Sequence, residues 1–152
     1  MRTLVVDDDP VSALVLRKTL ERMGHEPVVA SNGLEALERH RLDPFPVIVS
    51  DWMMPGMDGL TLCRYVRDDR SDAYTYVILL TAKTQRRDRL EALQAGIDDF
   101  LTKPLDAAEL AARLNVADRI VVSDTKLREL NASLLASSRE LAAQAVELDR
   151  LR

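Results

Sequence analysis

The chain has 152 residues, a hydrophobic content of 47% and a formal net charge of −4, which is typical of one folded domain with a real core. The mild negative charge argues against a basic nucleic-acid-binding surface, so we expect no nucleic acid contacts. The single cysteine excludes a disulfide framework within the chain and fits a reducing compartment. No apolar run has the length of a membrane span, and no signal peptide is recognisable. We therefore expect a cytoplasmic protein with no membrane contact.

Short apolar runs alternate with amphipathic stretches over the first hundred residues. The runs predict strands at residues 3–6, 27–30, 47–50, 76–80 and 99–102. Helices are expected between them, and Gly24 and Gly96 each follow a helical stretch as stop signals. Five strands that alternate with helices indicate βα units around a parallel sheet.

The helices carry start signals and apolar stripes. Asp9 is expected to cap the first helix, with Pro10 in its first turn. The side chains of this helix expected to face the sheet are Val11, Leu14, Val15 and Leu20. The helix after Asn32 is expected to turn Leu34 and Leu37 inward, and both histidines, His25 and His40, are expected to face solvent.

Charged residues follow three of the expected strands. Asp7 and Asp8 come directly after the first strand, Asp51 ends the third, and Lys103 follows the fifth. Because the carboxyl ends of parallel strands share one edge of an open sheet, where ligands bind, these side chains are expected to meet. Three acids and one lysine at such an edge predict a site for a cation and a phosphate group.

The tail has a different pattern. Residues 105–152 contain no glycine or proline, and Asp106 with Glu109 fits a capping box. Apolar residues then recur at heptad spacing, with one seam fully apolar (Ile120, Leu127, Leu134, Leu141, Leu148) and the other mixed (Ser123, Leu130, Ser137, Gln144, Leu151). A continuous helix from Ala107 would be roughly 70 Å long. We therefore expect residues 1–119 to form the domain and 120–152 a coiled-coil helix, with a parallel homodimer through residues 120–148.

These motifs, in this order, resemble the receiver domain of bacterial two-component response regulators (CheY-like). The resemblance covers residues 2–120 and is carried by Asp7-Asp8, the segment Asp51–Gly59, Thr81-Ala82 and Phe100–Pro104. It implies an α/β, doubly wound, flavodoxin-like fold: a five-stranded parallel sheet of order 2-1-3-4-5. An extended C-terminal helix would follow it.

The resemblance also implies a chemistry for the strand ends. Asp51 would be the nucleophile that accepts a phosphoryl group from a sensor histidine kinase or phosphotransfer protein. Mg²⁺ would be bound directly by Asp8 and Asp51, through water by Asp7, and by the backbone carbonyl of Met53. The Lys103 ammonium would neutralise charge on the transferred group, and the Lys103–Pro104 peptide bond would be cis.

Three further residues would carry a switch. The Thr81 hydroxyl would move toward phosphorylated Asp51, and Phe100 would swing inward into the vacated space. Ala82 is small, so it would leave the site open and offer its backbone N–H to phosphate. Phe100 departs from the tyrosine that the family often has, and it lacks the hydroxyl that could hold an outward position.

The role of the tail stays open between three interpretations. It resembles linkers that join receivers to diguanylate cyclase domains, and comparable linkers precede histidine kinase or phosphatase modules. It could instead be a helix that docks on a partner, or a helix folded back on the domain. Within the 152 residues we find no cyclase, kinase or DNA-binding signature, so no enzymatic activity beyond the domain's own phosphotransfer and dephosphorylation is expected.

Two other functions compete with the phosphoacceptor role. One is a Mg²⁺-dependent aspartyl-phosphate phosphatase, which usually has a second acid two residues after its nucleophile. Here that position is Met53, which argues against it. The other is a scaffold that no longer accepts phosphate, and the complete set of acids, threonine and lysine argues against that.

Overall fold

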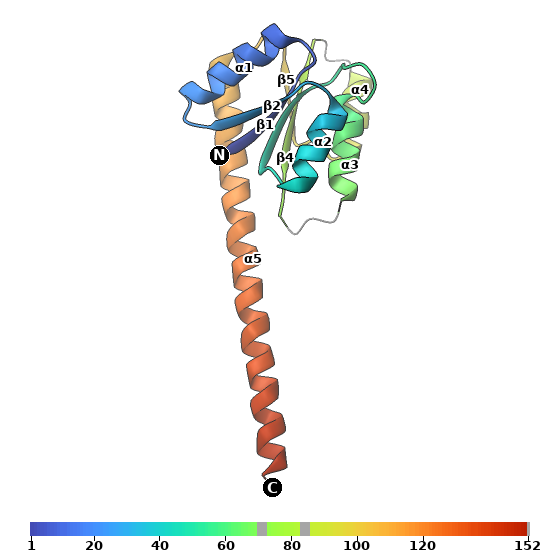
Figure 1. Cartoon of the computed structure of the whole chain (residues 1–152). Helices are drawn as coiled ribbons and strands as arrows, with labels where there is room; N and C mark the ends of the chain where they lie inside the picture. The colour runs from blue at the N-terminus through green and yellow to red at the C-terminus, as the bar shows by residue number, and fades with distance from the viewer. Residues whose placement is uncertain (70–72, 83–85, 152) are drawn as a thin grey trace.

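The computed structural model describes residues 1–69, 73–82 and 86–151, with backbone only at 86–88 (Figure 1). Five parallel strands form one sheet of order β2-β1-β3-β4-β5, which confirms the expected fold class. The strands are β1 (Arg2–Val6), β2 (Glu26–Ala30), β3 (Val47–Asp51), β4 (Tyr76–Thr81) and β5 (Asp99–Thr102). The helices are α1 (Pro10–Arg22), α2 (Gly33–Leu42), α3 (Gly59–Asp68), α4 (Arg86–Gln94) and α5 (Ala107–Arg150).

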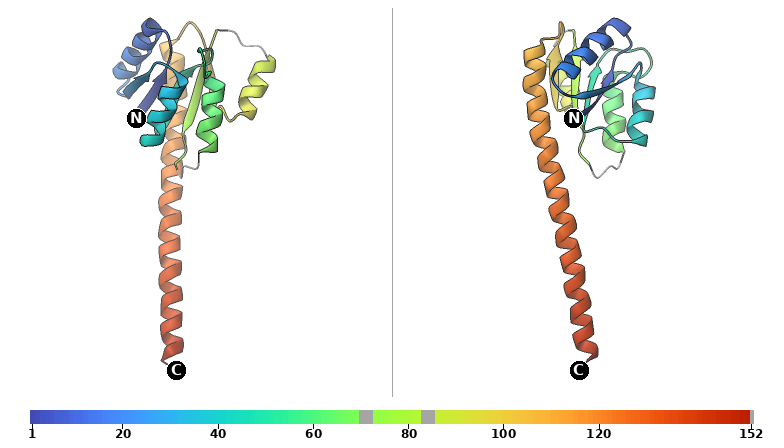
Figure 2. Two further views of the ribbon diagram at one scale, coloured as in Figure 1. Left: turned by 45° about the vertical axis from the view of Figure 1, so that its right-hand side comes forward. Right: turned by 60° about the vertical axis from the view of Figure 1, so that its left-hand side comes forward.

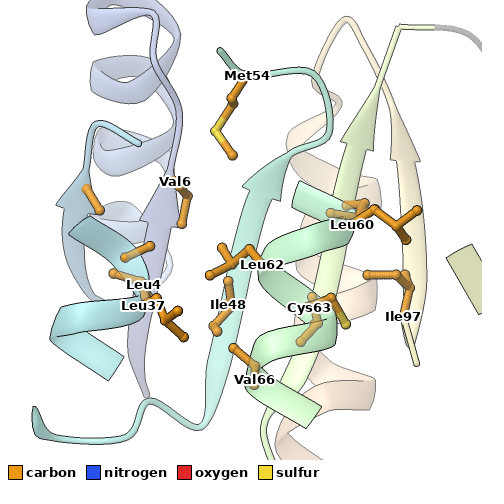
Figure 3. Close-up of a cluster of buried hydrophobic side chains, with 14 of the residues drawn as sticks. Leu4, Val6, Leu37, Ile48, Met54, Leu60, Leu62, Cys63, Val66 and Ile97 are labelled. Carbon is orange, nitrogen blue, oxygen red and sulfur yellow. The ribbon is translucent and has the colours of Figure 1, made fainter. Parts of the chain in front are cut away.

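Helices cover both faces of the sheet. Figure 2 shows α5 on one side of the strands and α2 with α3 on the other. Two buried clusters correspond to these layers, since one joins the sheet to α1 and α5 and the other joins it to α2, α3 and α4. All residues of β3 and β4 are buried, as expected for strands covered on both faces. Figure 3 shows the second cluster, with Leu4 and Ile48 from the sheet facing Leu37, Leu62 and Val66.

Side-chain caps fix where four of the helices begin. Each capping side chain accepts a hydrogen bond from a backbone N–H in the first turn, which satisfies a donor that the helix leaves unpaired. The capping residues are Asp9, Asn32, Asp58 and Asp106. The expected starts at Asp9 and Asp106 are therefore confirmed.

The apolar stripes of α1 and α2 differ from those expected. In α1 the buried residues are Ala13, Leu16 and Leu20, whereas Val11, Leu14 and Val15 are 69%, 47% and 53% exposed. Ala13, Leu16 and Leu20 follow one helical face, and apolar residues on a neighbouring face made the pattern ambiguous. In α2, Leu37 is buried as expected, but Leu34 is exposed because Ala36 and His40 share the inner face with Leu37.

The prediction that both histidines face solvent is wrong. His40 is buried, its Nδ1 accepts a hydrogen bond of 3.1 Å from the Phe45 backbone N–H, and the two rings stack. His25 is half-buried, with its Nδ1 3.1 Å from the N-terminal nitrogen of Met1. Both rings therefore have specific partners that isolated positions in a sequence do not reveal.

Helix α5 extends far beyond the domain. Its 44 residues begin beside the strand ends, run antiparallel to the strands and leave the domain at the opposite edge of the sheet (Figure 1). Leu110, Leu114 and Ala117 are buried against the sheet, and every described residue from Lys126 onward is exposed. The folded-back interpretation of the tail is therefore wrong for this structure. No described helix, including α5, combines the length and apolar character needed to cross a membrane.

Candidate functional site

The strand ends bring the predicted acidic residues together. Asp7 and Asp8 follow β1, and Asp51 is the last residue of β3, which pairs with β1. Carboxylate oxygens of the three residues all lie within 4.8 Å of one another. Asp7 and Asp51 are buried and Asp8 is exposed, so the cluster opens to solvent on one side.

Lys103 completes this cluster from the far side of β4. Its Nζ donates a hydrogen bond of 2.8 Å to Asp51 Oδ2. Its backbone N–H donates to the Thr81 carbonyl at 2.8 Å, which fixes the start of the loop after β5. The Lys103–Pro104 peptide bond is cis, as expected.

Burial and neighbouring charges both shift the pKa values of this cluster. Burial is the main influence on the pKa of Asp7 and raises it, and the negative charges of Asp51 and Asp8 act in the same direction. Partial burial opposes the charge on Lys103, but the hydrogen bond to Asp51 and the nearby carboxylates outweigh it and raise the pKa of Lys103. The lysine is therefore held charged beside the acids.

Backbone contacts hold Asp51 in place. The Trp52 N–H donates to the Leu80 carbonyl at 3.0 Å, and the Gly59 N–H donates to the Trp52 carbonyl at 2.8 Å. A Cβ atom on Gly59 would lie 2.4 Å from the Asp51 carbonyl oxygen, so only glycine allows the loop 52–58 to close back against β3. The strand end and the start of α3 are thus packed together at the acidic cluster.

The predicted switch residues lie around the same edge. Thr81 is buried at the end of β4, Ala82 is exposed next to it, and Phe100 is half-buried in β5. The Phe100 ring stacks on Trp52 with 6.2 Å between ring centroids, and the Arg89 guanidinium lies 6.0 Å from the Phe100 ring centre. This stack was not predicted from the sequence, in which Trp52 and Phe100 are far apart.

The donor set suits a hard divalent cation. Three carboxylates facing one ammonium leave the cluster with negative charge, and carboxylate oxygens are the donors that Mg²⁺ prefers. Asp7 Oδ1 accepts a hydrogen bond of 3.0 Å from the Asp9 N–H, which orients this carboxylate. The Met53 side chain is 77% exposed, and within the described ranges no hydrogen bond ends on its carbonyl oxygen.

An apolar surface beside the acids was missed by the sequence reasoning. A cavity of about 250 Å³ is lined by Asp7 and Lys103 together with apolar residues of α1 and of the loop after β5. The apolar residues include Val11, Val15, Pro104 and Leu105. The exposed apolar residues of α1 that departed from the expected stripe thus lie next to the charged cluster.

A polar network at the opposite edge of the sheet was also missed. Arg67 of α3 donates to the Gly96 and Thr75 carbonyls and pairs with Asp98 at 2.8 Å. Asp98 also accepts a hydrogen bond from the Tyr74 hydroxyl, and the Tyr74 N–H donates to Asp124 of α5 at 3.0 Å. These residues are far apart in sequence, so no local pattern could have indicated the network.

Comparison with known proteins agrees with this arrangement. The family model described as response regulator receiver domain matches residues 3–115. The response regulator PleD of Caulobacter vibrioides is 39% identical over 132 residues, which is 87% of this chain and 29% of PleD. The transcriptional regulatory protein CseB of Streptomyces coelicolor is 39% identical over 76% of this chain and 48% of its own length. This chain thus spans less than half of either relative.

Solved structures share the fold. A Francisella response regulator receiver domain has a TM-score of 0.70 and 38% identity, over 76% of this chain and 94% of that one. The receiver domain of a sensor histidine kinase from Pseudomonas aeruginosa has a TM-score of 0.68 and 30% identity, over 78% and 94% of the two chains. That structure has a magnesium ion coordinated in its active site cleft. By its sequence and its fold, the present chain belongs to the response regulator receiver domain family of two-component signalling.

Proposed function

We propose that Asp51 is the phosphoacceptor of this receiver and that it takes a phosphoryl group from a phosphohistidine. One observation carries the proposal: the Lys103 ammonium lies 2.8 Å from Asp51 Oδ2 in a cluster of acids at the ligand-binding edge of the sheet. The carboxylate can attack phosphorus while Lys103 offsets charge on the phosphoryl oxygens, and phosphoryl transfer depends mostly on such positioning and neutralisation. The histidine of the donor leaves as the O–P bond forms.

Mg²⁺ is the proposed cofactor. Asp8 and Asp51 would bind it directly, Asp7 would act through a water molecule, and the Met53 carbonyl would complete the protein ligands. When bound, the cation supplies charge neutralisation at the phosphoryl oxygens. The convergence of three carboxylates within 4.8 Å supports this assignment, since a cation would relieve the crowding of negative charge among them.

The donor is proposed to be a sensor histidine kinase or a phosphotransfer protein. Val11, Val15 and Pro104, which are exposed, and Leu105, which is half-buried, form an apolar border around Asp7 and Lys103. A donor must bring its phosphohistidine to Asp51 with little water between them, and an apolar border fits a partner helix that covers the site. We therefore propose that this exposed face of α1 is where the phosphodonor protein binds.

The output is proposed to pass through α5. Thr81 and Phe100 would respond to phosphorylation of Asp51, and a parallel homodimer through residues 120–148 would respond in turn. Exposed Leu127, Leu134 and Leu141 on a helix with no covering layer support the pairing. A linker to an output domain, with diguanylate cyclase favoured, remains our proposal for residues 120–152.

The acceptor is tested by phosphorylation with acetyl phosphate and Mg²⁺, followed by intact-mass measurement. The wild-type chain should gain one phosphoryl group, and Asp51→Asn should gain none, because the amide keeps the shape but removes the nucleophile. Asp58→Asn is the control, since asparagine can still cap α3 and Asp58 is also an acid of this loop. Equal phosphorylation of Asp51→Asn would reject the assignment.

The phosphatase alternative has a separate test. An aspartyl-phosphate phosphatase would turn over a small phosphoester continuously, whereas a receiver would take up the phosphoryl group and release it slowly. Such enzymes have a second acid where this chain has Met53. Met53 is exposed, and its thioether has no proton to donate. Sustained turnover that depends on Asp51 would favour the enzyme.

A further inference from the structure

Helix α5 has two apolar stripes where it passes the receiver. One stripe, with Leu110, Leu114 and Ala117, is buried against the sheet. The other follows the spacing Val116, Ile120, Ser123 and Leu127, and it lines a groove of about 560 Å³ whose side wall is Tyr74. We call this surface the Tyr74 groove. The stripe of the groove is continuous in register with the exposed heptad seams of the tail.

We propose that the Tyr74 groove is the first part of the dimer interface and that α5 of a second copy of this chain occupies it. The inference rests on the proposed parallel homodimer through residues 120–148, called here the stalk dimer, and adds Tyr74, Val116 and Arg119 of the receiver side to its interface. Pairing would then bury Tyr74 of each receiver beside the partner helix. Without this contact, helix pairing would begin only where α5 is fully exposed, from Lys126 onward.

Charge complementarity at the groove favours a second copy in parallel orientation. Arg119 and Asp124 both line the groove. When Ile120 and Ser123 occupy the core positions a and d, Arg119 is a g position and Asp124 is the e position of the next heptad. In a parallel coiled coil these two positions face each other across the helices, so each Arg119 would meet the partner's Asp124.

Both residues are available for that contact. Arg119 is exposed and has no ion pair among the described side chains. Asp124 is 29% exposed, and its described hydrogen bonds, from the Tyr74 N–H and from Arg128, both end on Oδ2. Oδ1 can therefore accept from the partner's arginine while Asp124 still holds Tyr74.

The groove would also connect the pairing of the two α5 helices to the conformation of the receiver. The Tyr74 hydroxyl donates to Asp98, which immediately precedes β5, and Arg67 joins Asp98 to the Gly96 carbonyl after α4. A displacement of the α4–β5 loop would reach Tyr74 through these bonds. Helix pairing at Tyr74 would therefore depend on the position of that loop.

Disulfide trapping tests the proposal, because two serines occupy equivalent d positions. In a Cys63→Ala background, Ser123→Cys reports on the groove and Ser137→Cys reports on the free tail. Ala136→Cys, on the outer side of the tail, is the control for random collision. With a mild oxidant, both serine variants should form linked dimers roughly tenfold faster than the control, because pairing replaces collision with a high effective concentration.

The two failures are distinguishable. If Ser137→Cys links and Ser123→Cys behaves like the control, the groove is not part of the interface and this inference is overturned, while the stalk dimer stands only for the fully exposed tail from Lys126 onward. If neither variant links faster than the control, both the inference and the proposed stalk dimer are overturned.

The charge contact has its own readout. In the Ser123→Cys chain, Arg119→Asp should slow linking severalfold by placing an acid opposite Asp124, and Arg119→Lys should largely preserve the rate. Arg139→Asp, an exposed reversal outside the core and flanking positions, is the matched control. An equal rate for Arg119→Asp and Arg139→Asp would overturn the proposed arrangement.

Discussion

The Lys103 ammonium and the Asp51 carboxylate meet above β4, with Nζ 2.8 Å from Oδ2. Asp51 ends β3 and Lys103 follows β5, and the sheet order places β4 between these strands. The pair therefore depends on the whole arrangement of the three strands rather than on local sequence. It also places a cation where a phosphoryl group on Asp51 would need one.

Removal of that cation should slow phosphorylation. In Lys103→Met the aliphatic part of the side chain is kept and the ammonium is lost. The rate of modification by acetyl phosphate should fall on the order of a hundredfold, as when one charge-stabilising group is removed from an active site. The rate is measured by intact mass over time. Lys126→Met, at an exposed position of α5, should react like the wild type, and an unchanged rate in Lys103→Met would remove Lys103 from the mechanism.

The exposed acid of the cluster should be needed for magnesium. In Asp8→Ala one hard oxygen ligand and one negative charge are lost, so Mg²⁺ affinity should fall at least about tenfold. Trp52 adjoins Asp51 and provides a fluorescence signal for the titration. Asp43→Ala, an exposed acid at the other edge of the sheet, is the control. A titration of Asp8→Ala that overlays the wild type would contradict the site.

Stability should fall at mildly acidic pH because of His40. Burial lowers the pKa of His40 from its ordinary value of 6.5, so the unfolded chain binds a proton there more readily than the folded chain. The contribution is fully present above the unfolded pKa and is lost as the pH falls through the lower, folded pKa. Protonation of Nδ1 would also break its hydrogen bond from Phe45.

Urea unfolding at several pH values between about 7.5 and 5 measures this dependence. The free energy of unfolding should decrease toward acid in the wild type and decrease less steeply in His40→Asn, whose amide oxygen can accept the Phe45 N–H. His25→Asn is the comparison, because burial also lowers the pKa of His25 and should give a contribution of the same sign. Identical slopes for the wild type and His40→Asn would show that His40 does not titrate on unfolding.

The aromatic stack should report the switch. Trp52 stacks on Phe100, so a movement of Phe100 on activation should change Trp52 fluorescence. Beryllofluoride with Mg²⁺, which mimics a phosphoryl group, should change the emission of the wild type by more than Mg²⁺ alone. In Phe100→Leu that additional change should be largely lost. If it persists at full size, the signal arises from the metal site and Phe100 is not part of the response.

The sequence predicted two features well: the charged residues at the strand ends and the long helix with heptad spacing. Strand runs followed by Asp7, Asp51 and Lys103 predicted both the sheet and the convergence of these residues at one edge, because parallel strands end together. The heptad spacing of Leu127 and Leu134 predicted a long helix beyond the domain, and α5 confirms it. In both cases a simple geometric rule connects spacing in the chain to position in space.

The packing faces of the helices and the contacts between distant residues could not be predicted from the sequence. In α1 the face with Ala13, Leu16 and Leu20 is buried, and the equally apolar face with Val11, Leu14 and Val15 is exposed. The Trp52–Phe100 stack and the Tyr74–Asp124 hydrogen bond join residues that are distant in sequence. A single sequence contains no periodic signal for such contacts, since each depends on how complete elements pack.

The position of the phosphoryl group is the most direct test of the account. The phosphorylated chain is treated with borohydride, which reduces an aspartyl phosphate to homoserine, and the peptides are then sequenced by mass spectrometry. The account predicts homoserine at position 51, with aspartate retained at Asp7, Asp8 and Asp58. Homoserine at another acid with intact Asp51, or phosphate on a histidine or serine, would contradict it.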